Sequence, residues 1–277
     1  MDIKQLLKEK GFRFNKQFGQ NFLTDNNLLA DISEDAGVQG GTVLEIGAGA
    51  GTLTRALSQS ADKVIAFEID RNLEKILNIT LADCPNVKVV MGDVMRYKVS
   101  EVEEMCGGPY RVVANIPYYI TTPLLMQFIE QGTQVTSLTL TIQKEVAQRL
   151  SASPATKDYG AITVAVDAVA DVTLTRILPR ELFYPQPNVD SAVVRIDINR
   201  NKYDISDHKL FRKTVKVAFA MRRKTLVNNL MVGFKMSREQ AESVLTACNF
   251  AANCRGEELS TQQFVLMCNT LEQMGIQ

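Results

Sequence analysis

The sequence predicts a mixed α/β fold in which a doubly wound, mostly parallel sheet is followed by a small all-helical domain. Between residues 42 and 145, short β-branched runs alternate with amphipathic segments, a pattern typical of parallel strands joined by helices. After residue 200 the apolar residues recur at helical spacing. A chain of 277 residues suits one large domain and one small domain. We therefore predict a first domain over residues 1–200 and a helical domain over residues 201–277.

The strands of the predicted sheet are short runs rich in β-branched residues. In chain order, the parallel strands are predicted at residues 42–46, 63–69, 86–91, 110–115 and 135–142. Helices are predicted between and after them, including residues 71–82, 122–132, 208–230 and 237–248. Two later strands, 172–178 and 191–198, are joined by a Pro-rich loop without a helix-length insert, so they should pair antiparallel. Residues 160–170 fit a helix or a strand.

The composition excludes several classes of protein. Hydrophobic residues make up 45% of the chain and charged residues 22%, as in ordinary folded domains. The sequence has no run of ~18 apolar residues to span a membrane, and its charged N-terminus is unlike a secretory signal. Its five cysteines form no CxxC pair, and His208 is its one histidine, which argues against zinc and multi-histidine sites. We expect a cytoplasmic protein with reduced thiols, no bound metal and no membrane contact.

The charges cancel overall but are unevenly distributed. The 31 basic and 31 acidic residues give a net charge of zero. Residues 211–225 nevertheless contain no acid and six basic residues, Arg212, Lys213, Lys216, Arg222, Arg223 and Lys224. This basic segment is either a docking surface for phosphate groups or a solvated helix face. Basic residues near the N-terminus would extend such a surface, or belong to a disordered start: Lys4, Lys8, Lys10, Arg13 and Lys16.

A glycine-rich loop follows the first parallel strand. In VLEIGAGAGTLT (43–54), Gly47, Gly49 and Gly51 let the backbone approach a ligand closely. Thr52 stands where a dinucleotide-binding fingerprint has its third glycine, which argues against a pyrophosphate site. The acid at the end of this strand, Glu45, would repel a diphosphate but attract a cation.

Two acids follow the next strands of the predicted sheet. Glu68 closes the second strand, where its carboxylate can accept hydrogen bonds from both hydroxyls of a ribose. Asp93 follows the third strand, within reach of an adenine amino group. A glycine loop and two acids on three successive strand ends describe an adenosine pocket at the carboxyl edge of the sheet. The positively charged S-adenosylmethionine fits this acidic loop better than a nicotinamide dinucleotide does.

The segment NIPYY (115–119) follows the fourth strand at the same edge. An adenine amine is a poor nucleophile because its lone pair is delocalised into the ring. The Asn115 side-chain oxygen and a backbone carbonyl at the Pro117 turn can accept its two hydrogens, and Tyr118 can stack on the base. Phe183, in the loop before the last strand, is a candidate for the opposite wall of a base sandwich, or else a buried anchor of that loop.

Together these motifs resemble the ribosomal RNA adenine dimethyltransferase family over nearly the whole chain. The matching segments are FGQNFL (18–23), EIGAGAG (45–51), NIPY (115–118), QKEVAQRL (143–150), DYG (158–160), FYPQPNVDSAVVR (183–195) and FAMRRKTLVNNL (219–230). The resemblance implies a Rossmann-like, S-adenosylmethionine-dependent methyltransferase domain. It also implies a cofactor pocket formed by Asn21, Leu23, Gly47, Glu68, Asp93 and Asn115, and catalytic roles for Asn115, Pro117, Tyr118 and Phe183.

The resemblance further implies the substrate. Two adjacent adenosines in a hairpin near the 3′ end of 16S rRNA would each be methylated twice at N6, within the assembling 30S subunit. The protein would act as a monomer, with Arg222, Arg223 and Lys224 contacting RNA. Two positions depart from the common bacterial pattern, Tyr119 in place of a small polar residue and Asn188 in place of lysine.

Other functions share parts of this pattern. Methyltransferases acting on large-subunit RNA have the same pocket, although DYG and FAMRRKT favour the small-subunit branch. A non-catalytic assembly factor could keep the fold, but intact Asn115, Pro117 and Tyr118 argue against it. A small-molecule methyltransferase would leave the basic segment without a role. An NAD-dependent oxidoreductase is disfavoured by Thr52.

Overall fold

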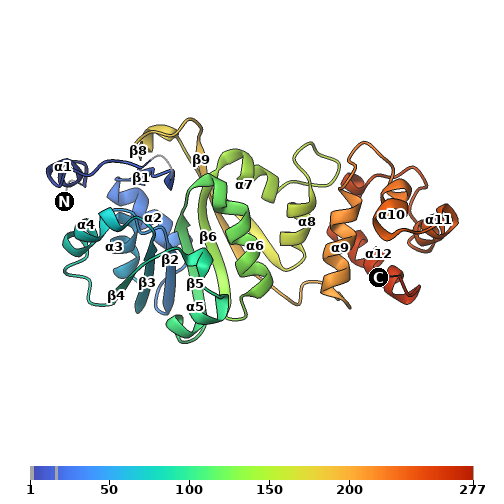
Figure 1. The fold of residues 1–277 in the computed structure, drawn as a ribbon, viewed down its shortest axis with the longest axis horizontal. Helices are drawn as coiled ribbons and strands as arrows, with labels where there is room; N and C mark the ends of the chain where they lie inside the picture. Colours follow the sequence, from blue (N-terminus) through green and yellow to red (C-terminus); the bar gives the residue numbers. More distant parts are fainter. Residues whose placement is uncertain (1–2, 16–17, 277) are drawn as a thin grey trace. The chain divides into compact units, whose positions relative to one another are not determined.

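A seven-stranded sheet forms the centre of the first part of the chain (Figure 1). The computed structural model describes residues 3–15 and 18–276. The strands of this sheet are β2 (Thr42–Ile46), β3 (Lys63–Glu68), β4 (Val87–Met91), β5 (Tyr110–Asn115), β6 (Val135–Gln143), β7 (Ala170–Leu178) and β9 (Ser191–Ile198). Their order across the sheet is β4-β3-β2-β5-β6-β9-β7. The predicted strands are confirmed, and β2, β5 and β9 have the predicted bounds.

The direction of the strands also agrees with the prediction. Strands β2 to β6 pair parallel with their neighbours, and β9 pairs antiparallel with β6. Between β7 and β9, the Asn199 N–H donates to the Val169 carbonyl, and the Thr175 hydroxyl donates to the Val193 carbonyl. Residue numbers rise from 169 to 175 along β7 and the residue before it, while those of their partners fall from 199 to 193 along β9 and the residue after it, so the two strands are antiparallel.

Helices cover both faces of the sheet, since successive residues of β2 and β3 are buried on either side. The helices of this part are α1 (Ile3–Glu9), α2 (Asn26–Asp35), α3 (Thr52–Ser58), α4 (Glu74–Thr80), α5 (Val99–Cys106), α6 (Thr121–Gln131) and α7 (Lys144–Leu150). Single turns of 3-10 helix lie at η2 (Arg71–Leu73), η3 (Val94–Arg96), η4 (Tyr118–Ile120) and η5 (Arg180–Leu182). One core cluster joins α2, α3 and α4 to one face, with Val43, Val64 and Val113 at its centre.

The connections place a crevice at the carboxyl ends of β2 and β5. Strands β3 and β4 follow on one side of β2, whereas β5 and β6 lie on its other side. The strand order therefore reverses between β2 and β5, and the loops after these two strands diverge to opposite faces. Open α/β sheets bind ligands at such a point.

A small second sheet lies beside this edge. Strand β1 (Phe22–Leu23) pairs antiparallel with β8 (Phe183–Tyr184), with Phe22 opposite Tyr184 and Leu23 opposite Phe183. The pairing brings the N-terminal FGQNFL segment against the Pro-rich loop that precedes β9.

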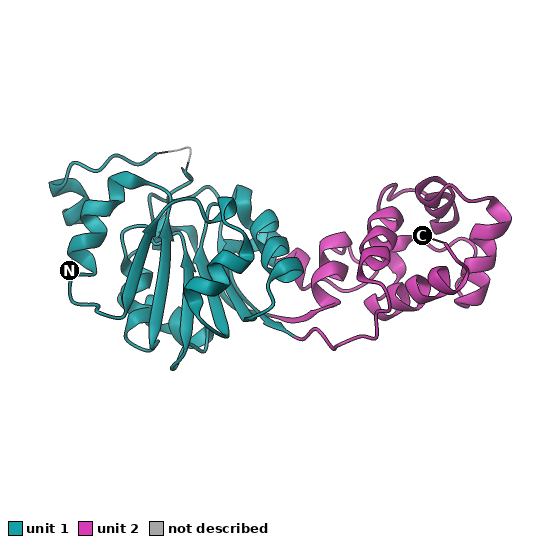
Figure 2. Ribbon diagram, turned by 60° about the horizontal axis from the view of Figure 1, so that its bottom comes forward, with its two compact units in different colours: residues 1–147, 173–198 teal, residues 148–172, 199–277 magenta. Residues whose placement is uncertain are grey.

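Contacts divide the chain into two compact units, residues 1–147 with 173–198 and residues 148–172 with 199–277 (Figure 2). The second unit contains α8 (Ala161–Asp167), α9 (His208–Ala218), α10 (Leu226–Phe234), α11 (Arg238–Ala247), α12 (Thr261–Gln273) and the turn η6 (Gly256–Glu258). Residues 148–172 thus pack with the C-terminal helices, although they precede residue 200. The ambiguous segment at 160–170 is largely helical, as α8. Division into domains of 1–200 and 201–277 stays a prediction.

The segment 208–230, predicted as helical, is divided between two helices, because α9 ends at Ala218 and α10 begins at Leu226. A buried side chain fixes the break. Asn229 Nδ2 donates to the carbonyls of Ala218 and Met221, at 3.1 and 3.3 Å, and Asn229 Oδ1 accepts the Met221 N–H at 3.0 Å. These bonds satisfy backbone groups left open by the end of α9. Arg222, Arg223 and Lys224 consequently lie in a connection between helices.

In the part of the chain that the structure describes, every helix is too short or too polar to cross a membrane.

Candidate active site

A cavity opens at the carboxyl edge of the sheet, where the strand order reverses. It is lined by four segments: residues 18–23, residues 47–49 with 52–53, residues 68–69, and residues 115–118. These are the N-terminal motif, the glycine loop, the end of β3 and the end of β5. The fold therefore brings together seven of the predicted site residues, Asn21, Leu23, Gly47, Glu68, Asn115, Pro117 and Tyr118.

The glycine loop lies close to the N-terminal motif. Gly49 has a φ of +59°, and a Cβ built on it would lie 2.9 Å from Cε1 of Phe22. A side chain at this position would be strained and would collide with the ring. The Thr52 hydroxyl donates to the Leu23 carbonyl at 3.0 Å. The residue that replaces the third glycine of a dinucleotide fingerprint thus fastens the loop to β1.

Glu68 joins the glycine loop to the loop after β3. Its side chain is 5% exposed, and its carboxylate accepts the N–H groups of Gly49 and Asp70, each at 2.7 Å. Burial raises the pKa of Glu68, and the two backbone hydrogen bonds oppose that rise. A carboxylate has about four acceptor positions, so Glu68 keeps capacity for further donors such as sugar hydroxyls.

The N-terminal motif orients the Asn115 amide. Asn115 Nδ2 donates to the Asn21 carbonyl at 3.0 Å, and Asn21 Nδ2 donates to the Gly19 carbonyl at 3.1 Å. One N–H of the Asn115 amide is thus engaged, and its side-chain oxygen keeps its capacity as an acceptor in a residue that lines the cavity. The Pro117 carbonyl accepts the Ile120 N–H at 3.2 Å, which closes the η4 turn.

Tyr118 is fixed by a residue that the sequence did not indicate. Its hydroxyl lies 2.8 Å from Oγ of Ser191, the fully buried first residue of β9. Burial raises the pKa of Tyr118, and this hydrogen bond partly offsets the rise. The two residues lie 73 positions apart in the chain, so only the pairing of β9 beside β6 could have revealed the contact.

Two predicted site residues lie outside the cavity lining. Asp93 follows β4 at the same edge, where its carboxylate accepts the Met95 N–H at 3.0 Å and lies 3.6 Å from Arg96. Phe183 is 5% exposed, pairs with Leu23 and belongs to the core of the first unit. Their roles in binding adenine rings stay predictions.

Glu45 lies beneath the site rather than in its lining. It has no exposed surface, and neither carboxylate oxygen has a hydrogen-bond partner among the described residues. Burial raises the pKa of Glu45 to about 8, and the negative charge of Glu68 adds to the rise. Burial thus favours the protonated form of Glu45 over the ionised one.

The basic segment in the second unit is partly engaged within that unit. Arg222 Nε donates to Glu257 at 2.6 Å, and its guanidinium also donates to the Lys157 carbonyl at 2.7 Å. The side chains of Arg223 and Lys224 are exposed and have no polar partner in the described ranges. Among the predicted RNA-contacting residues, these two have unengaged charges. Lys16, also predicted to extend the basic surface, lies outside the described residues.

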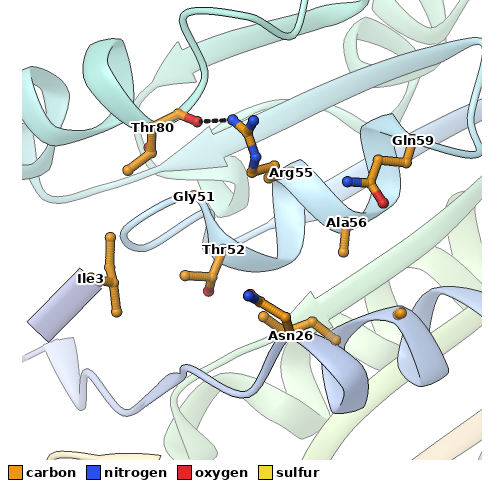
Figure 3. Close-up of a pocket in the computed structure, with 10 residues that line it drawn as sticks. Ile3, Asn26, Gly51, Thr52, Arg55, Ala56, Gln59 and Thr80 are labelled. Atoms are coloured by element: carbon orange, nitrogen blue, oxygen red, sulfur yellow. Dashed lines mark hydrogen bonds between the residues drawn. The ribbon is translucent and has the colours of Figure 1, made fainter. Parts of the chain in front are cut away.

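A second cavity lies between α1, α2, α3 and α4 (Figure 3). Arg55 crosses its wall and donates to the Thr80 carbonyl at 2.8 Å, and its guanidinium also pairs with Asp83. Thr52 lines this cavity as well as the first. Gly51 of the glycine loop lines this second cavity, whereas Gly47 and Gly49 line the first. Residues 3–15 and 18–276 contain no cluster of His, Cys, Asp and Glu suited to a metal ion.

Comparisons with known proteins agree with this geometry. The family model described as "Ribosomal RNA adenine dimethylase" matches residues 11–273. A "Ribosomal RNA small subunit methyltransferase A" of Clostridioides difficile is 42% identical over 97% of this chain and 94% of its own. Its namesake in Streptococcus gordonii is 42% identical over 99% of this chain and 97% of its own.

Solved structures share the fold. A dimethyladenosine transferase from Plasmodium falciparum has a TM-score of 0.79 at 24% identity, with 92% of this chain and 98% of that one covered. The 23S rRNA methyltransferase ErmE has a TM-score of 0.70 at 27% identity, covering 91% of this chain and 100% of that one. The sheet is that of a Rossmann-like rRNA methyltransferase. By its near-complete match to the family model and its relatives, the chain belongs to the ribosomal RNA adenine dimethylase family of methyltransferases.

Proposed function

We propose that this protein transfers methyl groups from S-adenosylmethionine to N6 of two adjacent adenosines in a hairpin near the 3′ end of 16S rRNA. The substrate is the assembling 30S subunit in the cytoplasm, the product of each adenosine is N6,N6-dimethyladenosine, and the enzyme acts as a monomer without a metal. The observation that carries the proposal is the Asn115 amide, held by Asn21 with its oxygen in the wall of a cavity that also contains Glu68.

The residues of the cavity suit S-adenosylmethionine. Glu68 is a buried acid with acceptor capacity left over, which favours a hydroxyl-rich ligand and disfavours a diphosphate. Gly49 lets the glycine loop pack directly against Phe22 in the cavity lining, since a side chain there would collide with the ring. Glu68 would hold the ribose, Asp93 the adenine amine, and Gly47, Asn21 and Leu23 the remainder. When bound, the cofactor supplies an electrophilic methyl group on a positively charged sulfur.

The residues at the end of β5 would activate the target amine. The Asn115 oxygen accepts one N6 hydrogen. A backbone carbonyl at the Pro117 turn, which the Ile120 N–H closes, accepts the other N6 hydrogen. Both acceptors bias the nitrogen toward a tetrahedral shape and direct its lone pair at the methyl donor. Tyr118, fixed by Ser191, stacks on the base. The methylated nitrogen is acidic and releases its proton to water, so no strong base is needed.

Methyl incorporation into ribosomal particles tests the proposal. Tritiated S-adenosylmethionine is supplied with undermethylated 30S particles, 50S particles or free nucleosides, and the labelled nucleoside is mapped. We expect N6,N6-dimethyladenosine at two adjacent positions in 30S particles alone. A second candidate substrate is 23S rRNA, because ErmE shares the fold at 27% identity. Label in 50S particles would favour that candidate, and label in neither particle would overturn both.

A further inference from the structure

Tyr119 is an aromatic residue that the proposed reaction does not use. Its side chain is 65% exposed, more than that of Tyr184, which is 38% exposed. Tyr184 packs edge-on against Phe14, with ring centroids 5.3 Å apart. Tyr119, by contrast, has no hydrogen bond or ring contact with residues 3–15 or 18–276. A single exposed apolar residue is ordinary on a protein surface, so its position must carry the argument.

Tyr119 lies directly beside the candidate base-binding residue on a rigid turn. Both tyrosines belong to η4, in which successive side chains point about 120° apart because a 3-10 helix has three residues per turn. Tyr118 lines the cavity and Tyr119 does not. The turn is closed by the Ile120 N–H to the Pro117 carbonyl and continues into α6 through the buried Thr121. The exposed ring is therefore held at the rim of the cavity.

We propose that Tyr119 is a stacking platform for the nucleobase next to the adenosine that enters the cavity, an inference that rests on the function proposed above. Extruding one adenosine removes the stacking partner of its neighbour in the strand. Exposed aromatic rings bind such unstacked bases through their π faces, whatever the base. The ring holds the adjacent nucleotide while Tyr118 holds the target, and so Tyr119 sets how the strand enters the cavity.

Kinetics on undermethylated 30S particles give the first test. We expect Tyr119→Ala to raise the KM for the particle about tenfold, within the range that loss of a stacking aromatic produces. The kcat and the Kd for S-adenosylmethionine should change by less than about twofold, because Tyr119 does not line the cavity. Tyr119→Phe and Tyr119→Trp keep a π face and should retain a KM near that of the wild type.

The chain contains no tryptophan, so Tyr119→Trp also creates a single fluorescent reporter. We expect an RNA hairpin with two adjacent adenosines in its loop to quench this reporter by stacking. Ile79→Trp is the matched control: Ile79 is 36% exposed near the end of α4, which leads to the amino end of β4, opposite the cavity. Its fluorescence should not change when the same hairpin is added.

The outcomes separate this inference from the proposed function. An unchanged KM in Tyr119→Ala, or equal fluorescence changes in the two tryptophan variants, would overturn the platform while wild-type methylation of 30S particles continued. A lower kcat or weaker S-adenosylmethionine binding in Tyr119→Ala would also overturn it, because the residue would then act through the cavity. A wild-type protein that methylates no 30S particle would overturn the proposed function, and the platform with it.

Discussion

Two side chains at the carboxyl edge of the sheet have opposite relations to their surroundings. Asn115 is oriented through its NH2 group by a backbone carbonyl of the N-terminal motif, which leaves its oxygen for a ligand. Glu45 is the penultimate residue of the neighbouring strand β2, yet its carboxylate is fully buried without a partner among the described residues. Asn115 is therefore oriented to bind a ligand. Glu45 instead lowers the stability of the folded protein by an amount that depends on pH.

Replacing Asn115 should remove methyl transfer and leave cofactor binding in place. We expect Asn115→Ala to lower the methylation rate of 30S particles roughly 10²- to 10³-fold, the loss typical of one oriented transition-state partner. The Kd for S-adenosylmethionine, measured by calorimetry, should change by no more than a few fold. Asn188→Ala, an exposed amide, is the control and should keep its activity. Normal turnover in Asn115→Ala would refute the role of this residue.

The titration of Glu45 predicts a pH dependence of stability. Its pKa is about 8 in the folded chain against an ordinary value of 4.5, so between these pH values the folded state holds a proton that the unfolded state has released. The contribution to the free energy of unfolding therefore falls from pH 4.5 to 8 and is constant above pH 8. At pH 7 the free energy of unfolding is therefore lower than it would be with an unshifted Glu45 pKa, by on the order of 3 kcal/mol.

Glu45→Gln should remove this dependence, since the amide does not titrate. We expect urea unfolding to show the variant gaining stability over the wild type as the pH rises from 5 to 8. Glu104→Gln, on the exposed side of α5, should run parallel to the wild type throughout. If the Glu45→Gln and wild-type curves were also parallel, Glu45 would be ionised in the folded protein.

At the scale of the elements, the local sequence pattern predicts the strands correctly. It fails where a side chain farther along the chain determines where a helix ends. The β-branched runs gave β2, β5 and β9 with the observed bounds, because strands buried inside a sheet are nearly continuous apolar stretches. The helix predicted over 208–230 is interrupted because Asn229, on α10, satisfies the end of α9. Nothing in the helical spacing of that segment signals a buried amide turned back on the chain.

The residues of the site likewise fall into those that the sequence predicts and those that depend on tertiary contacts. Residues next to strand ends could be placed from the sequence, because parallel strands deliver their carboxyl ends to one edge. Glu68 and Asn115 were found by this rule, and the N-terminal Asn21 and Leu23 came from the resemblance. Ser191 could not be found, since its contact with Tyr118 depends on the antiparallel placement of β9.

The glycine loop and β1 form one packed element, which predicts the effect of a methyl group at Gly49. We expect Gly49→Ala to lower the free energy of unfolding by roughly 1–3 kcal/mol, because φ is +59° and the new Cβ would lie 2.9 Å from Phe22. S-adenosylmethionine affinity should fall with it. Gly160→Ala is the control, since its backbone is extended and a Cβ there meets nothing within 4 Å. Equal unfolding midpoints for the two variants would contradict the close packing.

Over the whole molecule, basic and acidic residues are equal in number, but the basic side chains differ in whether they already form ion pairs within the protein. Many basic side chains are committed to internal pairs, such as Arg176 with Asp35 at 2.6 Å and Lys202 with Asp167 at 2.7 Å. Arg222 belongs to this group through Glu257. Arg223 and Lys224 are among the exposed cations whose side chains have no such pair in the described chain, so their charges are available to phosphate.

Reversing these two charges should weaken binding to 30S particles and flatten its salt dependence. We expect Arg223→Glu with Lys224→Glu to reduce the slope of log K against log salt by about 2, since each phosphate contact releases about one counterion. Arg222 is left unchanged, because its replacement would break the pair with Glu257. Lys75→Glu with Lys88→Glu changes the net charge equally on exposed positions of the first unit and should keep the slope. An unaltered slope in the first variant would remove the docking role.

The ladder between β1 and β8 constrains how the chain can vary in length. Leu23 and Phe183 are partners although 160 positions separate them. Because strand side chains alternate between faces, one inserted residue that slipped this register would exchange the faces on which Phe22 and Leu23 lie. Insertions are therefore tolerable in the turns far from both strands, whereas homologues that keep this architecture must gain or lose residues around the ladder in compensating steps.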